Sequence, residues 1–163
     1  MKAWLWKGML AAAISLPALS GATGQAAQEQ RGQEQRTIEG VWDVSVTVVS
    51  CATGAPLFTD THGAVLMFID GGTMTEIADR SNRSAGLGTW RHLGGRSYSA
   101  LHKYIEYSAF GPNTFNGTTV ITREIELSKD GEEFTATATS EVFDKNDKLI
   151  STGCATSTAT RFE

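Results

Sequence analysis

The sequence predicts an all-β protein: one eight-stranded, up-and-down antiparallel β-barrel. Between residues 38 and 163, eight stretches are rich in β-branched or aromatic residues, and turn signals of Gly, Asn and Asp separate them. No segment there has the period of a long amphipathic helix. Short connections favour consecutive hairpins, and eight strands can close around one small ligand. A two-sheet sandwich is the alternative architecture.

Length and charge limit the classes of function. The chain has 163 residues, which suits a single domain, and its formal net charge is -4. Without Lys2 and Lys7, 12 basic residues face 18 acidic ones, a net charge of -6. Nucleic acids and anionic membranes are bound mainly through excess Lys and Arg, so we expect neither as a partner.

The N-terminus is typical of a signal peptide over residues 1–26. Lys2 and Lys7 precede an apolar stretch over residues 8–19, which is too short to span a bilayer comfortably. Cleavage is expected after Ala26, with the small residues 20–22 as an alternative site; a membrane anchor is the competing interpretation. Residues 27–37 lack core-forming side chains until Ile38, which predicts a flexible leader. No later stretch is apolar and long enough for a membrane span. We therefore expect an exported protein, periplasmic or secreted.

The expected strands follow in order along the chain. The clearest hairpin signals are Asp70-Gly71-Gly72 and Lys129-Asp130-Gly131, because Gly readily adopts the positive φ of tight turns. The strands are expected at residues 40–50, 62–69, 73–79, 87–93, 96–110, 115–127, 133–143 and 149–162.

The first and last strands should pair if the sheet closes. Cys51 and Cys154 are the only cysteines, and an exported protein would join them in a disulfide; two free thiols are the alternative. If Cys51 faces Cys154, paired residue numbers sum to about 205, so residue 44 faces Arg161. Arg161 then lies close to Trp42, where a guanidinium over an indole is favourable.

These residues resemble a known family. Gly40-Val41-Trp42 on the first strand, eight strands, and Arg161 on the last strand look like the lipocalin and calycin barrels. In that family the Trp packs under the Arg and closes the barrel floor, which implies structural roles for Trp42 and Arg161. The resemblance also implies an internal cavity for a small apolar molecule. The chain departs from typical lipocalins because it has no evident C-terminal helix after the barrel.

The strand at residues 96–110 carries polar side chains that could contact a ligand. Strict alternation puts Tyr98, His102, Tyr104 and Glu106 on one face. Inside a barrel they could bind a polar head group or act as general acid and base. A solvated outer face is the favoured interpretation, and a bulge could change the register midway.

Arg123 ranks first among candidate ligand-contacting polar residues. It shares a face with Ile121, Ile125 and Leu127, which indicates an inward direction. A buried Arg needs a partner, and Glu106 or a ligand carboxylate could serve. The alternative places Arg123 at the rim, reaching water.

Trp90 could form a stacking wall for a ligand ring or simply belong to the core. The histidines, His62, His92 and His102, lack the spacing of common zinc motifs, and we expect neither a metal nor a cofactor. No nucleophile elbow, phosphate loop or dinucleotide fingerprint is present in the sequence, so no catalytic residue is assigned.

Three functions remain open at this point. The first is a non-enzymatic, exported protein that binds an apolar or lipid-like molecule. The second is a barrel enzyme, an isomerase or cyclase, that uses His102, Tyr104 or Glu106. The third is a filled barrel that binds a protein or envelope component. An inward cluster of titratable groups would favour the enzyme, a dry apolar cavity the binder, and the absence of a cavity the interaction module.

Overall fold

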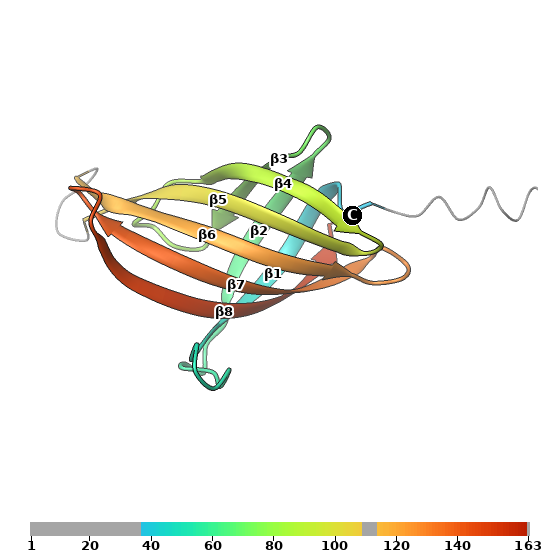
Figure 1. Cartoon of the computed structure of the whole chain (residues 1–163), viewed down its shortest axis with the longest axis horizontal. Helices are drawn as coiled ribbons and strands as arrows, with labels where there is room; N and C mark the ends of the chain where they lie inside the picture. The colour runs from blue at the N-terminus through green and yellow to red at the C-terminus, as the bar shows by residue number, and fades with distance from the viewer. Residues whose placement is uncertain (1–36, 109–113, 163) are drawn as a thin grey trace, which may run out of the picture. The chain divides into compact units, whose positions relative to one another are not determined.

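A computed structural model describes residues 37–108 and 114–162 (Figure 1). The predicted signal peptide, all of the predicted leader but residue 37, and the far end of the fifth predicted strand lie outside the described residues. The described strands are β1 (Gly40–Val49), β2 (His62–Ile69), β3 (Thr73–Ala78), β4 (Gly86–Gly94), β5 (Ser97–Tyr107), β6 (Phe115–Leu127), β7 (Glu133–Asp144) and β8 (Leu149–Arg161).

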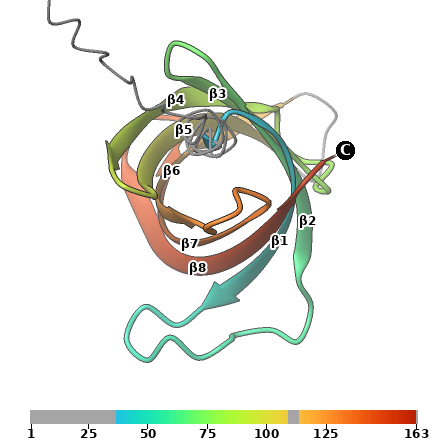
Figure 2. The ribbon, with the colours of Figure 1, turned by 90° about the vertical axis from the view of Figure 1, so that its right-hand side faces the viewer.

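The eight strands form one closed antiparallel barrel. Each strand pairs with the next along the chain, and β8 pairs with β1 to complete the ring (Figure 2). The fold class is therefore confirmed, and the sandwich alternative is wrong. This up-and-down barrel is consistent with a lipocalin-like fold. Alternation along β1 explains the core: Trp42 and Val44 are buried, while Asp43 and Ser45 are exposed.

The closing register differs from the predicted one by two residues. Trp42 pairs with Arg161, and Val49 pairs with Cys154, so paired numbers sum to 203 rather than 205. The reason is that Cys51 lies two residues beyond the end of β1, in the loop that follows, and reaches Cys154 from there. The predicted pairing of the two cysteines is present, with their Cα atoms 5.2 Å apart.

One end of the barrel is filled by aromatic side chains. The Trp42 and Phe134 ring centroids lie 4.9 Å apart, and Phe68 lies 6.3 Å from Phe134. The Arg161 guanidinium lies over the Trp42 ring, 4.4 Å from its centroid, as the resemblance implied. Gly40 has a φ of 128°, a conformation that residues with a Cβ rarely adopt, and a Cβ there would also come within 2.7 Å of Arg161 Nη1. We call this the closed end.

The turn between β6 and β7 belongs to the closed end and is tied to Arg161. Arg161 donates from Nε and Nη2 to the Gly131 carbonyl, and from Nη1 to the Glu39 carbonyl. Viewed along the barrel, this turn overlies the ring (Figure 2). Strand β1 runs from here to the opposite end, which carries the disulfide and which we call the open end. The described residues include no helix of the length and apolarity that a membrane crossing requires.

Candidate functional site

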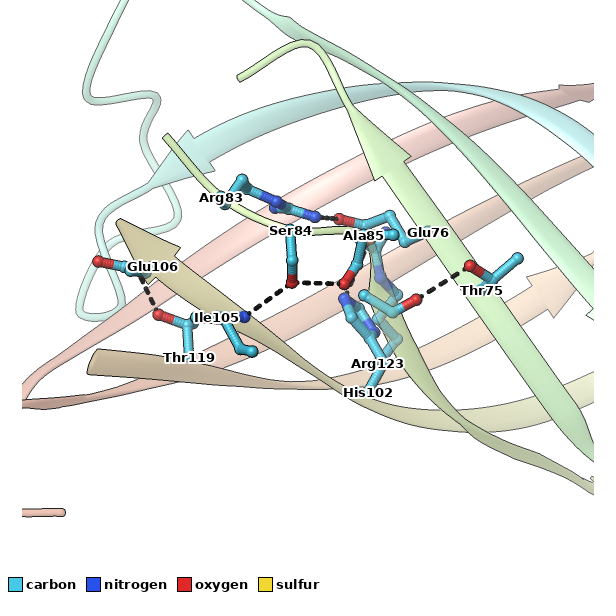
Figure 3. A network of polar contacts seen from close by, with 11 residues as sticks. Thr75, Glu76, Arg83, Ser84, Ala85, His102, Ile105, Glu106, Thr119 and Arg123 are labelled. Atoms are coloured by element: carbon cyan, nitrogen blue, oxygen red, sulfur yellow. Dashed lines mark hydrogen bonds and ion pairs between the residues drawn. The ribbon is translucent and has the colours of Figure 1, made fainter. Parts of the chain in front are cut away.

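A buried carboxylate, Glu76, lies at the centre of a polar cluster inside the barrel (Figure 3). It comes from the inward face of β3, between Met74 and Ala78, and only 3 % of the residue is exposed. Arg83 Nη2 and Arg123 Nη2 each donate to one of its oxygens at 2.5 Å. Burial of a carboxylate is tolerated only with such charged donors around it.

His102 from β5 is the third neighbour of Glu76. Its Nε2 lies 3.1 Å from Glu76 Oε2, and the residue is 1 % exposed. Two glycines on β4 make room for it. A Cβ on Gly86 would lie 2.8 Å from His102 Cδ2, so a side chain there would displace the imidazole. A Cβ on Gly88 would lie 2.0 Å from the Leu101 carbonyl oxygen and 2.5 Å from His102 Cα, so a side chain there would force β4 away from β5.

Arg123 projects inward from β6 and is 4 % exposed. The predicted inward direction is confirmed, and the alternative position at the rim is wrong. Its partner is Glu76 rather than the predicted Glu106. Glu106 instead accepts a hydrogen bond from Thr119 Oγ1 at 2.7 Å. Among the described residues, Nε and Nη1 of Arg123 have no hydrogen-bond partner.

Arg83 reaches the cluster from the loop between β3 and β4. Backbone bonds hold this loop against β5: Ser84 donates to the Ile105 carbonyl at 2.9 Å, and Tyr107 donates to the Asn82 carbonyl at 2.7 Å. The Arg83 guanidinium lies over the Tyr104 ring, 3.7 Å from its centroid, which is a favourable cation–π distance. Arg83 Nε, like Arg123 Nε, lacks a partner within the described part of the chain.

A cavity of about 240 Å³ lies beside this cluster, toward the open end. Its wall is mostly small or aliphatic, and its charged members are Glu76, Arg80, Arg83 and Arg123. The remaining wall includes Val46, Val48, Ala64, Ala78, Tyr104, Thr119, Ile121, Ala138 and Ala155. Two larger hollows, of about 980 and 700 Å³, are lined in part by the exposed Thr135 and Thr158. We consider those two hollows features of the barrel surface.

The electrostatics of the cluster keep Glu76 ionised. Burial alone would raise the pKa of Glu76, but the neighbouring His102 and Arg123 side chains outweigh it and hold that pKa well below its usual range. Burial lowers the pKa of Arg123, and the charge of Glu76 opposes that shift. The carboxylate therefore balances cations and is a poor proton acceptor at neutral pH.

The favoured outward direction for the even residues of β5 is wrong. His102 is buried and Tyr98 is 5 % exposed, whereas Leu101 on the opposite face is 49 % exposed. The register of β5 with β6 stays regular from Ser97 to Glu106 and shifts only at the end of the strand, so the same face points inward throughout. The barrel accepts this polar face because Glu76 and Arg123 on other strands provide partners.

Of the five residues predicted to contact a ligand, only two line the cavity. Arg123 and Tyr104 line the cavity. His102 is in contact with Glu76, and Glu106 is bonded to Thr119 on the cavity wall. Trp90 lies nearer the closed end, 6.2 Å from the Phe68 ring and 5.9 Å from the Tyr98 ring, and donates from Nε1 to the Ile69 carbonyl.

Glu76 and Arg83 were not predicted from the sequence as members of a site. A signal for Glu76 was present: it is the one charged residue on the face that Met74 and Ala78 share. Arg83 lies in a loop, and no local pattern marks it as part of a site.

Within residues 37–108 and 114–162, no three His, Cys, Asp or Glu side chains gather in a way that could hold a metal ion. A scan against protein-family models finds no match, and a search of the curated proteins finds no similar sequence. The chemistry of this site must therefore be argued from its own geometry.

Proposed function

We propose that this protein binds a small organic molecule reversibly in the open-end cavity and does not transform it. One observation carries the proposal: the closed end is filled by Trp42, Phe68 and Phe134, while about 240 Å³ remain open beside the Glu76 cluster. A concave, mostly apolar wall with a few convergent polar groups is typical of a ligand site.

The geometry favours binding over the two alternative functions. An inward cluster of titratable groups is the feature expected of a barrel isomerase or cyclase. However, Glu76 is engaged by two guanidiniums and an imidazole, and its lowered pKa makes it a weak base. The cavity also argues against an interaction module with a filled barrel.

The disulfide and the barrel support two further parts of the proposal. A disulfide-bonded barrel fits an exported protein, because disulfides persist in oxidising compartments. Export after cleavage behind Ala26 is tested by the intact mass of the protein recovered from the exported fraction. The Trp42–Arg161 pair at the closed end supports membership of the calycin superfamily.

A cavity-filling variant tests the proposed binding. Ala138 lines the cavity, so Ala138→Phe should block it, whereas the neighbouring Thr137 faces outward and Thr137→Phe provides the matched control. We would screen a library of small organic molecules by ligand-observed NMR against all three proteins. Compounds should bind the wild type and Thr137→Phe but not Ala138→Phe. Equal binding to all three folded proteins, or no binding to any, would refute the proposal.

A further inference from the structure

The open-end cavity has an excess of positive charge. Among the described residues that line it, Arg80, Arg83 and Arg123 are cations, and Glu76 is the single carboxylate. Glu76 is already shared by two of these guanidiniums and His102. Arg80 contacts the His62 imidazole at the rim of the cavity. Glu106, which does not line the cavity, accepts a hydrogen bond from the hydroxyl of Thr119 on the cavity wall. The site therefore favours an anion over a cation or a neutral molecule.

Unused donors are present beside this cavity. Arg123 is 96 % buried, and no residue in the described part of the chain accepts a hydrogen bond from its Nε or Nη1. The same is true of Arg83 Nε. A buried polar group without a hydrogen-bond partner destabilises the folded protein. A site that retains such donors therefore favours a ligand that can accept hydrogen bonds from them. A guanidinium presents paired N–H groups in a plane, which match the two oxygens of a carboxylate.

The size of the cavity limits the rest of the ligand. At about 240 Å³ it lies below the ~300–1,000 Å³ that is usual for drug-sized ligands. Aliphatic side chains, including Val46, Val48 and Ile121, form much of the opposing wall. The body of the ligand should therefore be short and apolar, such as one aromatic ring or a short alkyl chain.

We propose that the cavity binds a compact monocarboxylate, with its carboxylate group directed at Arg123 and Arg83 and its apolar body against the aliphatic wall. This inference rests on the proposed binding function and names its ligand class. Arg83 comes from the loop after β3, and its guanidinium is held over the Tyr104 ring.

Matched acids and amides test the proposal by isothermal titration calorimetry. The probes are benzoate, 3-phenylpropanoate and hexanoate, each compared with its neutral amide at pH 7 and low salt. At least one acid should bind about tenfold more tightly than its amide or better, the ratio expected from one charged hydrogen bond. Added salt should reduce this difference, because part of it is electrostatic.

Two arginine variants test whether the preference for the acid depends on Arg83. Arg83→Met should lower the affinity for the acid about tenfold and leave the affinity for the amide unchanged. Arg96→Met is the matched control, because the Arg96 side chain is 40 % exposed, pairs with Glu126 and does not line the cavity, and it should change the affinity for the acid less than about threefold. If Arg83→Met does not fold, Arg83→Lys keeps the charge and removes the planar fork, and it should still weaken acid binding.

The outcomes separate this inference from the proposed function. If acids and amides bind equally, or if only neutral compounds bind, the carboxylate proposal is wrong while small-molecule binding stands. If an acid binds more tightly than its amide but the Arg83 and Arg96 variants respond alike, the anion is held elsewhere and the proposal is wrong. If neither the acids nor any library compound binds, both proposals fail.

Discussion

Two inward-pointing arginines occupy opposite ends of this barrel and differ in how their donors are used. Arg161, at the closed end, lies over Trp42 and donates to the carbonyls of Thr37, Glu39 and Gly131. Arg123, in the Glu76 cluster, donates to one carboxylate and keeps Nε and Nη1 free of partners among the described residues. The first arrangement is suited to holding strands together, whereas the second can accept a further anion. Burial alone therefore does not identify a structural Arg, because the Arg161 side chain is more exposed than that of Arg123.

The largest expected effect follows from removing the centre of the Glu76 cluster. Glu76→Gln leaves two buried guanidiniums without their counter-charge, and it should lower the free energy of unfolding by about 4 kcal/mol. Urea unfolding at pH 7 measures this. Glu133→Gln is the control, because Glu133 is exposed on β7. Equal stability of Glu76→Gln and the control would contradict the assigned role of the cluster.

Removing the disulfide, which lies at the open end, should have the next largest effect on stability. Cys51 and Cys154 are separated by 103 residues in the chain, so a Cys51→Ser/Cys154→Ser variant should lose about 3–4 kcal/mol by loop entropy. Unfolding of this variant and of the wild type under reducing conditions should coincide. A variant as stable as the oxidised wild type would show that other contacts hold the open end.

The third effect concerns the closed end. Arg161→Met removes the donors to three backbone carbonyls and should cost about 2–3 kcal/mol, while leaving the affinity for a cavity ligand within about twofold of the wild type. Arg83→Met should also cost stability, because Glu76 loses one of its buried donors, but unlike Arg161→Met it should weaken acid binding. Unfolding and titration of both variants give the comparison. If both lose affinity equally, the two ends are not separate in function.

The smallest expected effect is on the pH dependence of stability. The pKa of Glu76 is lowered in the folded protein, so its stabilising contribution is complete above its ordinary value of 4.5 and is lost as pH falls below that value. From pH 7 to pH 3.5, the wild type should lose about 1 kcal/mol more than Glu76→Gln does. Parallel loss in the two proteins would show that Glu76 is not stabilised in its ionised form.

The fold was predictable because it depends on local patterns. Alternation and turn residues placed β2 and β6 at the bounds that the structure has, His62–Ile69 and Phe115–Leu127. The two cysteines correctly predicted that β1 and β8 close the barrel. The register was wrong by two residues because a loop cysteine can reach a strand without being paired with it in the ladder.

The site was predictable only in part because its members come from separate elements. Arg123 was found because apolar neighbours share its face, which signals the barrel interior. The inward face of β5 was misjudged because Leu101 and Ile105 are apolar and yet point outward, so hydrophobicity favoured the wrong face. Glu76 and Arg83 become meaningful only when β3 and its following loop are seen against β5 and β6, which no local pattern shows.

The two ends of the barrel are compared most directly by an NMR titration that observes the arginine Nε–H signals while the tightest-binding of the three acids is added. We expect the signals of Arg123 and Arg83 to shift together and saturate, while that of Arg161 stays in place. A shift at Arg161 without one at Arg123 and Arg83, or no shift at any of the three, would contradict the division of this barrel into a structural closed end and an anion-binding open end.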